Sequence, residues 1–193
     1  NKSDDIKIFE IEQPDVLLWA IWSIQQYAKM VSKDECREKY GALVQSIMEY
    51  LLADKHPLIN LHDNGLLYVD GHNKAVTWMN SVANGQPVVP RSGYIVEINT
   101  LWYNALCFAN DLLNSNGEIE SLNSAKPIIE KLNNSFVETF LNEHGYLLDY
   151  VDGEVVDWSV RPNMIFAAAF DYSPLNSKQK KRVLDIVTKE LLT

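Results

Sequence analysis

The sequence has few cysteines and no long hydrophobic run, and both absences exclude classes of protein. Cys36 and Cys107 are the only cysteines and show no CxxC spacing, so no metal or redox motif is visible. No apolar run approaches the length that crosses a bilayer, and the acidic, polar start NKSDDIKIFEIE is not a signal peptide. Two buried thiols fit a reducing compartment, so we expect a cytoplasmic location.

Positive charge is also scarce, since 17 Lys and Arg face 26 Asp and Glu for a net charge of −9. Nucleic acids and anionic membranes reward positive charge, so we expect neither as a partner. The sequence contains no Gly-rich phosphate loop and no nucleophile elbow. Its four histidines lack the spacing of metal ligands: His56, His62, His72 and His144. We therefore expect no metal and no cofactor.

What the sequence does have is enough apolar material for one core. It is 193 residues long and 47% hydrophobic, which predicts a single globular domain or part of one. Five Trp and nine Tyr are a generous aromatic supply, and aromatic faces either fill cores or stack on sugar rings. Composition alone leaves both uses open.

Six segments show helical periodicity, and they alternate between two characters. The first, third and fifth are apolar around most of their circumference, which predicts burial on most sides. The second, fourth and sixth carry one apolar stripe and a charged face, which is typical of outer helices. We therefore predict an all-α fold class built from three inner/outer helical hairpins. The six ranges are about 15–31, 34–53, 95–113, 124–142, 161–171 and 177–192.

Two long connections separate the predicted helical hairpins, over about 54–94 and 143–160. Long loops in a compact domain are usually functional or disordered, and these contain strand-like alternation in LLYVDG and YLLDYVDGEVVDW. We expect short β-hairpins in both connections, with turns at Asp-Gly. If the odd helices run in one direction, both connections lie at the end that holds the N-termini of those helices.

Polar side chains occur at the start of each predicted inner helix, which indicates a binding site at that end. Arg91 and Glu97 either clamp vicinal sugar hydroxyls or form a structural ion pair, and both interpretations stay open. Glu97 and Asn104 share a helical face, whereas Asn99 points elsewhere as a structural hydrogen-bonding residue. Trp78 lies on a loop beside polar residues, which favours contact with a ligand. The candidate substrate-binding residues are Asp15, Trp78, Arg91, Glu97, Asn104, Asp157, Arg161 and Asn163.

Several motifs resemble those of one glycosidase family. They are D-V-L-L-W from Asp15, D-N-G-L-L-Y around Gly65, T-W-M-N followed by P-V-V-P-R, V-E-I-N-x-L-W-Y-N-A-L from Val96, V-R-P-N, and F-D-Y-S-P-L. In this order they cover the chain and resemble the amylo-α-1,6-glucosidase domain of glycogen debranching enzymes. The resemblance implies an (α/α)6 toroid, of which three hairpins are about half. We therefore expect residues 1–193 to form a single partial domain, with residues 1–13 as an N-terminal extension.

The resemblance also implies a reaction, the inverting hydrolysis of α-1,6-linked glucose at glycogen branch points. An inverting glycosidase needs a carboxylic acid and a carboxylate base about 6.5–9.5 Å apart. The family motif T-W-M-D places the general acid where this sequence has Asn80, and the family's base lies beyond Thr193. General acid catalysis contributes roughly 10²–10⁴-fold, so we expect this chain alone not to cleave glucan. Asn80 would contact substrate without proton transfer.

The resemblance implies glycogen or an α-glucan oligosaccharide as the partner and leaves open whether this chain is itself an enzyme. The alternative is a non-catalytic carbohydrate-binding or scaffolding helical module. A sugar isomerase or epimerase is a third option by fold analogy alone, and the sequence lacks the paired histidines it would want. Half of a toroid would expose apolar faces, so we also expect self-association.

Overall fold

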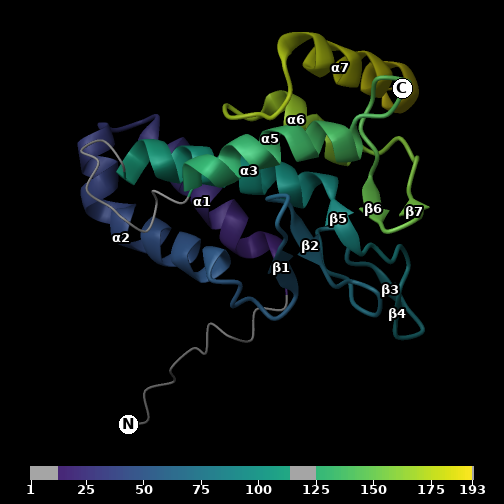
Figure 1. The fold of residues 1–193 in the computed structure, drawn as a ribbon, viewed down its shortest axis with the longest axis horizontal. Helices are drawn as coiled ribbons and strands as arrows, with labels where there is room; N and C mark the ends of the chain where they lie inside the picture. The colour runs from purple at the N-terminus through teal and green to yellow at the C-terminus, as the bar shows by residue number, and fades with distance from the viewer. Residues whose placement is uncertain (1–12, 114–124, 193) are drawn as a thin grey trace.

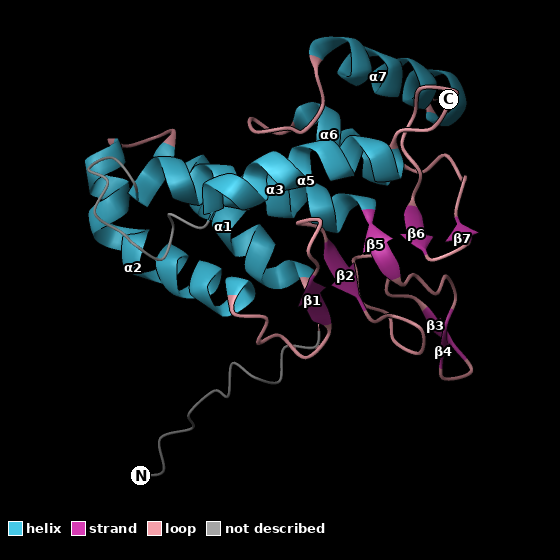
Figure 2. Ribbon diagram, viewed as in Figure 1, coloured by secondary structure: helices cyan, strands magenta, loops and turns pink. Residues whose placement is uncertain are grey.

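The computed structural model describes residues 13–113 and 125–192. Most of the expected N-terminal extension, residues 1–12, lies outside the described residues, as does Ser124, the expected start of the fourth helix. Helices form one side of the molecule and a sheet lies at one end of them (Figure 1, Figure 2). Helices make up 54% of the structure and strands 12%, so the fold is mixed α and β and the all-α prediction is wrong.

Each of the six predicted helical segments contains a helix. The bounds are α1 Asp15–Ala28, α2 Lys33–Leu52, α3 Val96–Leu113, α5 Ala125–Phe140, a 3-10 turn η2 Pro162–Met164 that continues into α6 Ile165–Ala169, and α7 Ser177–Leu191. The Ser32 side chain caps α2 by accepting a hydrogen bond from the Glu35 backbone N–H at 3.1 Å. Periodicity and caps are local signals, and they located these helices correctly.

The central element is α3, which packs against α1, α2, α5 and α6. Fourteen of its 18 residues are buried, as the apolar pattern of the third segment predicts. Its polar residues are satisfied inside the core. Asn99 accepts a hydrogen bond from Leu67 N at 2.8 Å and donates to the carbonyls of Leu67 and Ile95, at 3.0 and 3.1 Å. Asn99 therefore fastens the helix to the sheet, the structural role predicted for it.

The other two odd helices are not enclosed as α3 is. In α1 only five of 14 residues are buried, and Val16 on its outer side is 40% exposed. In α6 only Ala167 is buried. An apolar circumference indicates burial only when neighbours surround the helix, and α1, which packs against α2 and α3, and α6, which packs against α3 and α7, keep most of their residues partly exposed. The alternation of three inner and three outer helices therefore fails at α1 and α6.

The short β-hairpins that the sequence predicted are present in both connections, and they are joined into one sheet. Its strand order is β1-β2-β5-β6-β7, and every neighbouring pair is antiparallel. The first connection contributes three strands and the second contributes two, joined by β5 and β6 through the pairs Tyr94↔Val151 and Ile95↔Tyr150. The strand bounds are β1 Ile59–Leu61, β2 Leu67–Val69, β5 Gly93–Ile95, β6 Tyr150–Asp152 and β7 Val155–Val156. The two long connections therefore meet at one end of the molecule, as expected, but as one sheet.

A second, two-stranded ribbon projects beyond this sheet. It consists of β3 (Val82–Ala83) and β4 (Gln86–Pro87), and it lies away from the helices (Figure 1). The ribbon directly follows Asn80, which is exposed. Because β5 runs directly into α3, the residues between the ribbon and β5 lie close to the first turn of the central helix.

Both cysteines are free thiols. Cys36 is buried and Cys107 is half-buried, and burial raises the pKa of Cys107 to about 11. Within residues 13–113 and 125–192, no helix has both the length and the apolar character needed to cross a membrane.

Candidate functional site

A buried ion pair joins the end of the first long connection to the start of α3. Arg91 lies two residues before β5, and its guanidinium makes two hydrogen bonds to the Glu97 carboxylate, one from Nη1 to Oε1 and one from Nη2 to Oε2 at 2.6 Å. The two side chains are 1% and 2% exposed. Glu97 lies in the first turn of α3, where the helix dipole favours a negative charge. The structure therefore realises the ion-pair interpretation of these two residues.

Asp149 is a second carboxylate on the same guanidinium. Its Oδ2 lies 2.8 Å from Arg91 Nε, and its Oδ1 accepts a hydrogen bond from Arg91 Nη2 at 3.1 Å. Asp149 also accepts from Arg161 Nη1 at 2.8 Å and from Asn163 Nδ2 at 2.7 Å. Its backbone carbonyl accepts from Val96 N at 3.1 Å, which holds it against the start of α3. Asp149 is therefore the centre of this network.

Trp78 is fixed to the network by its indole N–H. Trp78 Nε1 donates to Asn163 Oδ1 at 2.9 Å, while the amide nitrogen of Asn163 donates to Asp149. Thr77, the preceding residue, accepts from Arg91 Nη1 at 3.2 Å. Trp78 is 51% exposed although its indole N–H is bound. The loop that carries Trp78 and Asn80 therefore rests on buried charges and presents an aromatic surface to solvent.

Two members of the network lie at its edge with solvent. Arg161 Nη1 donates to Asp157 Oδ2 at 2.7 Å, and the two side chains are 21% and 16% exposed. Partial burial works to raise the pKa of Asp157, but hydrogen bonds from Ser159 and Arg161 outweigh it and lower that pKa below its ordinary value. Asp157 therefore remains ionised at neutral pH and keeps an acceptor near the surface.

Burial dominates the electrostatics at the centre of the network. It raises the pKa of Glu97 above its ordinary value, and the hydrogen bonds and charge of Arg91 oppose this without cancelling it. Burial works to lower the pKa of Arg91, but the bonds and charges of Glu97 and Asp149 raise it. With two carboxylates on one guanidinium, most of the hydrogen-bonding capacity of the buried core is used by protein, and Arg91 Nε, which makes no hydrogen bond within the described residues, lies at ion-pair distance from Asp149. These buried residues support the more exposed members of the network, Trp78, Asp157 and Arg161.

The network that includes Asp149 brings together six of the eight candidate substrate-binding residues. They are Trp78, Arg91, Glu97, Asp157, Arg161 and Asn163. Sequence reasoning missed Asp149, which reads as an ordinary turn former in L-L-D-Y, and Thr77. Neither carries a local signal, because Asp149 meets Arg91 only when the two long connections pair, and Thr77 meets it only when the first connection folds back on itself.

Asn104 belongs to a different polar chain. It lies seven residues after Glu97, about 10 Å along the axis at 1.5 Å per residue. Asn104 Nδ2 donates to Gln25 Oε1 at 2.6 Å, and Gln25 Nε2 donates to Asp171 Oδ2 at 3.0 Å. Asn104 Oδ1 also accepts from Tyr172 N at 3.4 Å. Asn104 therefore ties α1 and α3 to the segment that follows α6.

Asp15 is buried at the start of α1, where it is 5% exposed. Burial raises the pKa of its carboxyl above the ordinary value. Its Oδ1 atom makes no hydrogen bond within the described part of the chain. No hydrogen bond or ion pair between described residues joins Asp15 or Asn104 to the network, so Asn104 takes part in a polar chain separate from that of Glu97.

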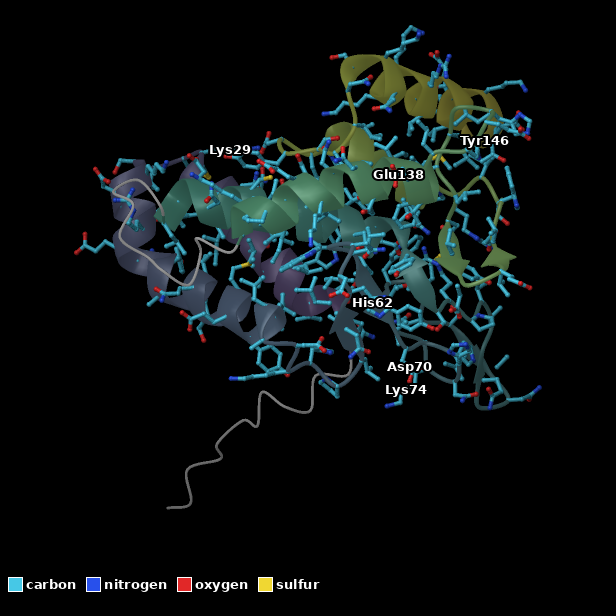
Figure 3. All side chains as sticks on the ribbon, in the orientation of Figure 1. Lys29, His62, Asp70, Lys74, Glu138 and Tyr146 are labelled. Atoms are coloured by element: carbon cyan, nitrogen blue, oxygen red, sulfur yellow. The ribbon has the colours of Figure 1, made fainter. Side chains whose placement is uncertain are left out.

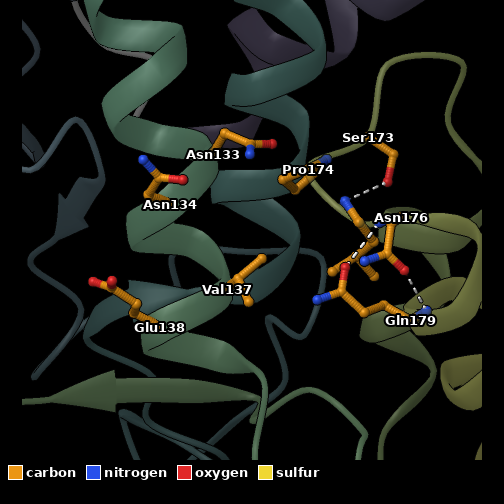
Figure 4. Close-up of a pocket in the computed structure, with 9 residues that line it drawn as sticks. Asn133, Asn134, Val137, Glu138, Ser173, Pro174, Asn176 and Gln179 are labelled. Carbon is orange, nitrogen blue, oxygen red and sulfur yellow. Dashed lines mark hydrogen bonds between the residues drawn. The ribbon is translucent and has the colours of Figure 1, made fainter.

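A separate cleft of about 480 Å³ lies between α5 and the segment 173–179. We call it the α5–α7 cleft; its lining includes Asn133, Asn134, Val137, Glu138, Asn176 and Gln179 (Figure 4). It shares no lining residue with the network. Glu138, in the cleft, and Asp70, which directly follows β2, lie in different parts of the molecule (Figure 3).

Among the described residues, no group of three or more His, Cys, Asp or Glu side chains could hold a metal ion.

Comparison with known proteins gives first a class and then a family. The class is the glycosidases of the glycogen-debranching type. Residues 8–193 match the model of the amylo-alpha-1,6-glucosidase family, and the chain belongs to that family. No curated protein matches the chain closely enough to count as a relative. The family resemblance that the sequence motifs indicated is thus confirmed.

Proposed function

We propose that this chain binds branched α-glucan at the surface that carries Trp78, Asn80, Asp157 and Arg161. The observation that carries the proposal is the exposed indole of Trp78, whose orientation is fixed by its hydrogen bond to Asn163 at 2.9 Å. An aromatic side chain that is already fixed in orientation loses little conformational entropy when the apolar face of a sugar ring stacks on it. Family membership supports a glucan as the ligand.

The residues of the network take two kinds of role in this proposal. Arg161 and Asp157 are partly exposed and offer a donor fork and an acceptor to sugar hydroxyls. Arg91, Glu97 and Asn163 are buried and act as positioning residues that hold the loop and Trp78 in place. Asp15 and Asn104 lie outside the proposed surface.

We propose further that the family reaction, inverting hydrolysis of α-1,6-linked glucose, is silent in this chain. Asn80 stands in T-W-M-N where the resemblance places the general acid. A carboxamide has no acidic proton to give to the leaving oxygen, and that proton is worth roughly 10²–10⁴-fold in rate. Asn80 is exposed beside Trp78, so it remains able to bond a substrate hydroxyl.

A matched pair of tryptophan variants tests the binding proposal. Trp78 and Trp158 are 51% and 48% exposed, but among the described residues only the side chain of Trp78 hydrogen-bonds to the network. Trp78→Ala should weaken maltotriose binding by about tenfold, within the roughly 1–3 kcal/mol scale of aromatic contacts and lost burial. Trp158→Ala should leave affinity unchanged in the same calorimetric titration. Equal losses in the two variants would count against the site.

Turnover is tested separately with the purified chain. Glucose release from a maltooligosaccharide that carries one α-1,6-linked glucose should stay at the level of the buffer blank across pH. Asn80→Asp, which is nearly isosteric, should bind the same substrate with unchanged affinity and so shows that the site is formed. Glucose release by the unaltered chain, lost in Asn80→Ala, would contradict the proposed silence.

The second candidate is a non-catalytic helical module that associates through its apolar surface. Trp19 and Phe166 from α1 and α6 pack edge to face with ring centroids 5.4 Å apart, and both are only half-buried. Val16 on the same helix as Trp19 is 40% exposed. A half-exposed aromatic cluster favours contact with a second copy. Sedimentation should show a dimer as concentration rises, and a monomer throughout would contradict this candidate.

A further inference from the structure

The α5–α7 cleft has the size and lining of a ligand site. Its volume of about 480 Å³ falls within the range of roughly 300–1,000 Å³ that is typical of small-molecule pockets. One wall is the middle of α5, and the other is the segment that leads into α7 (Figure 4). Most of its polar groups are uncharged carboxamides, which distinguishes it from the buried network.

The α7 wall presents hydrogen-bond donors in fixed positions. Gln179 Oε1 accepts from Asn176 N at 2.8 Å, and Asn176 Oδ1 accepts from Gln179 N at 3.0 Å, so the two residues form a reciprocal capping box. Both amide oxygens are used by the cap, which leaves both amide nitrogens available. In Figure 4 the amide nitrogen of Gln179 points toward α5. The helix cap therefore also orients the donors of this wall.

The α5 wall supplies acceptors together with further donors. Asn133, Asn134 and Glu138 make no side-chain hydrogen bond to any other residue that the structure describes. Asn134 and Glu138 are four residues apart and thus lie on the same face of α5. Val137, Pro174 and Leu175 also line the cleft, so it has an apolar surface as well.

This combination fits a neutral saccharide. Sugar hydroxyls both donate and accept hydrogen bonds, and a pyranose ring has C–H faces that suit the apolar surface. Among the described residues that line the cleft, Glu138 alone is charged, and its negative charge disfavours phosphates and carboxylates. We propose that the cleft is a second α-glucan site, an inference that rests on the proposed function for the identity of the sugar.

A second site would change how the chain holds a polymer. A glucan that reaches both the Trp78 surface and the cleft binds the second site at high effective concentration, whereas a short oligosaccharide binds each site independently. Loss of either site should therefore weaken binding to glycogen more than binding to maltotriose.

One titration tests this inference and the proposed function with separate reporters. The full chain, labelled with ¹⁵N, is titrated with maltotriose while two sets of side-chain N–H signals are followed. The carboxamide signals of Asn133, Asn134 and Gln179 report the cleft, and the indole signal of Trp78 reports the other surface. Both sets should shift, and the cleft signals should shift equally in Trp78→Ala.

Each alternative outcome has a definite meaning. Cleft signals that stay still while the indole signal moves would overturn the second site and leave the proposed function standing. Cleft signals that move while the indole stays still would support the cleft and overturn the Trp78 surface. Equal shifts with glycerol, or shifts with a short neutral peptide but not with maltotriose, would overturn α-glucan as the ligand.

Two exposed glutamates on α5 provide a matched control. Glu138 lines the cleft and Glu130 does not. Glu138→Ala should weaken maltotriose binding at the cleft by about tenfold, the loss expected for one hydrogen bond to a charged group. Glu130→Ala should bind as the unaltered chain does. If Glu138→Ala remains folded and its cleft affinity is unchanged, Glu138 does not bind the sugar. The cleft would then lack the charged acceptor on which the saccharide proposal depends, and the proposal would be contradicted.

Discussion

The buried network and the α5–α7 cleft are both polar, but they use their polar groups in opposite ways. In the network, Arg91 meets two carboxylates and almost every donor has a protein acceptor. In the cleft, Asn134 and Glu138 bond to no other described residue. Buried charge is costly unless it is paired, so the first set is committed to the fold. Exposed neutral amides cost little when left free, so the second set remains available for a ligand.

The largest effect that tests this comparison is expected from Arg91→Met. The substitution leaves Glu97 and Asp149 buried without their cation, and breaking such a buried pair costs about 3–5 kcal/mol. Chemical denaturation should show that loss in the free energy of unfolding. Arg161→Met should cost less, because the Arg161 side chain is 21% exposed. A loss of under about 1 kcal/mol for Arg91→Met would mean that the network does not stabilise the fold.

A glycine pair tests whether the network depends on the β5–β6 junction. Gly93 has φ of +89°, and a Cβ there would lie 2.3 Å from the carbonyl oxygen of Val151. Gly153 also has positive φ, +59°, but a Cβ there meets nothing within 4 Å. Gly93→Ala should therefore cost about 3 kcal/mol or more, and Gly153→Ala only the backbone term of about 1–2 kcal/mol.

Thermal unfolding of the two glycine variants measures the difference. Equal stability losses in Gly93→Ala and Gly153→Ala would show that β5 and β6 separate without cost. The ¹⁵N–¹H signal of the Trp78 indole, whose N–H donates to Asn163, should shift only in Gly93→Ala.

Acid should remove a smaller contribution from the edge of the network. The pKa of Asp157 is lowered in the folded state, so its stabilising effect is complete above the ordinary aspartate pKa near 4 and is lost as pH falls through the lowered value. The stability gap between the unaltered chain and Asp157→Asn should narrow below about pH 4. Glu97, whose pKa is raised, acts in the opposite direction, so the gap between the two proteins is the quantity to measure. A gap that is constant from neutral to acidic pH would contradict the lowered pKa.

The smallest effect on stability is expected in the cleft. Glu138→Gln removes a charge that bonds to no other described residue, so the free energy of unfolding should change by less than about 0.5 kcal/mol. Saccharide affinity should fall although stability does not. A large loss of stability would show that the cleft, like the network, is committed to the fold.

The sequence by itself determined the helices and several of their ends. Periodicity identified six helical segments, Ser32 marked the start of α2, and the all-round apolar pattern of α3 correctly indicated a buried helix. These are local signals, because neighbours within four residues create them. The motifs also identified the family before any geometry was known.

Only the tertiary structure decided the sheet and the roles of the charged residues. The β5–β6 pairing joins strands from separate connections, and nothing within either strand specifies a partner that far along the chain. That pairing brings Asp149 to Arg91 and turns a possible sugar clamp into a filled ion network. The cleft likewise forms only where α5 meets the start of α7. Local pattern fixes the elements, whereas distant contacts decide which polar groups are satisfied by protein and which remain for a ligand.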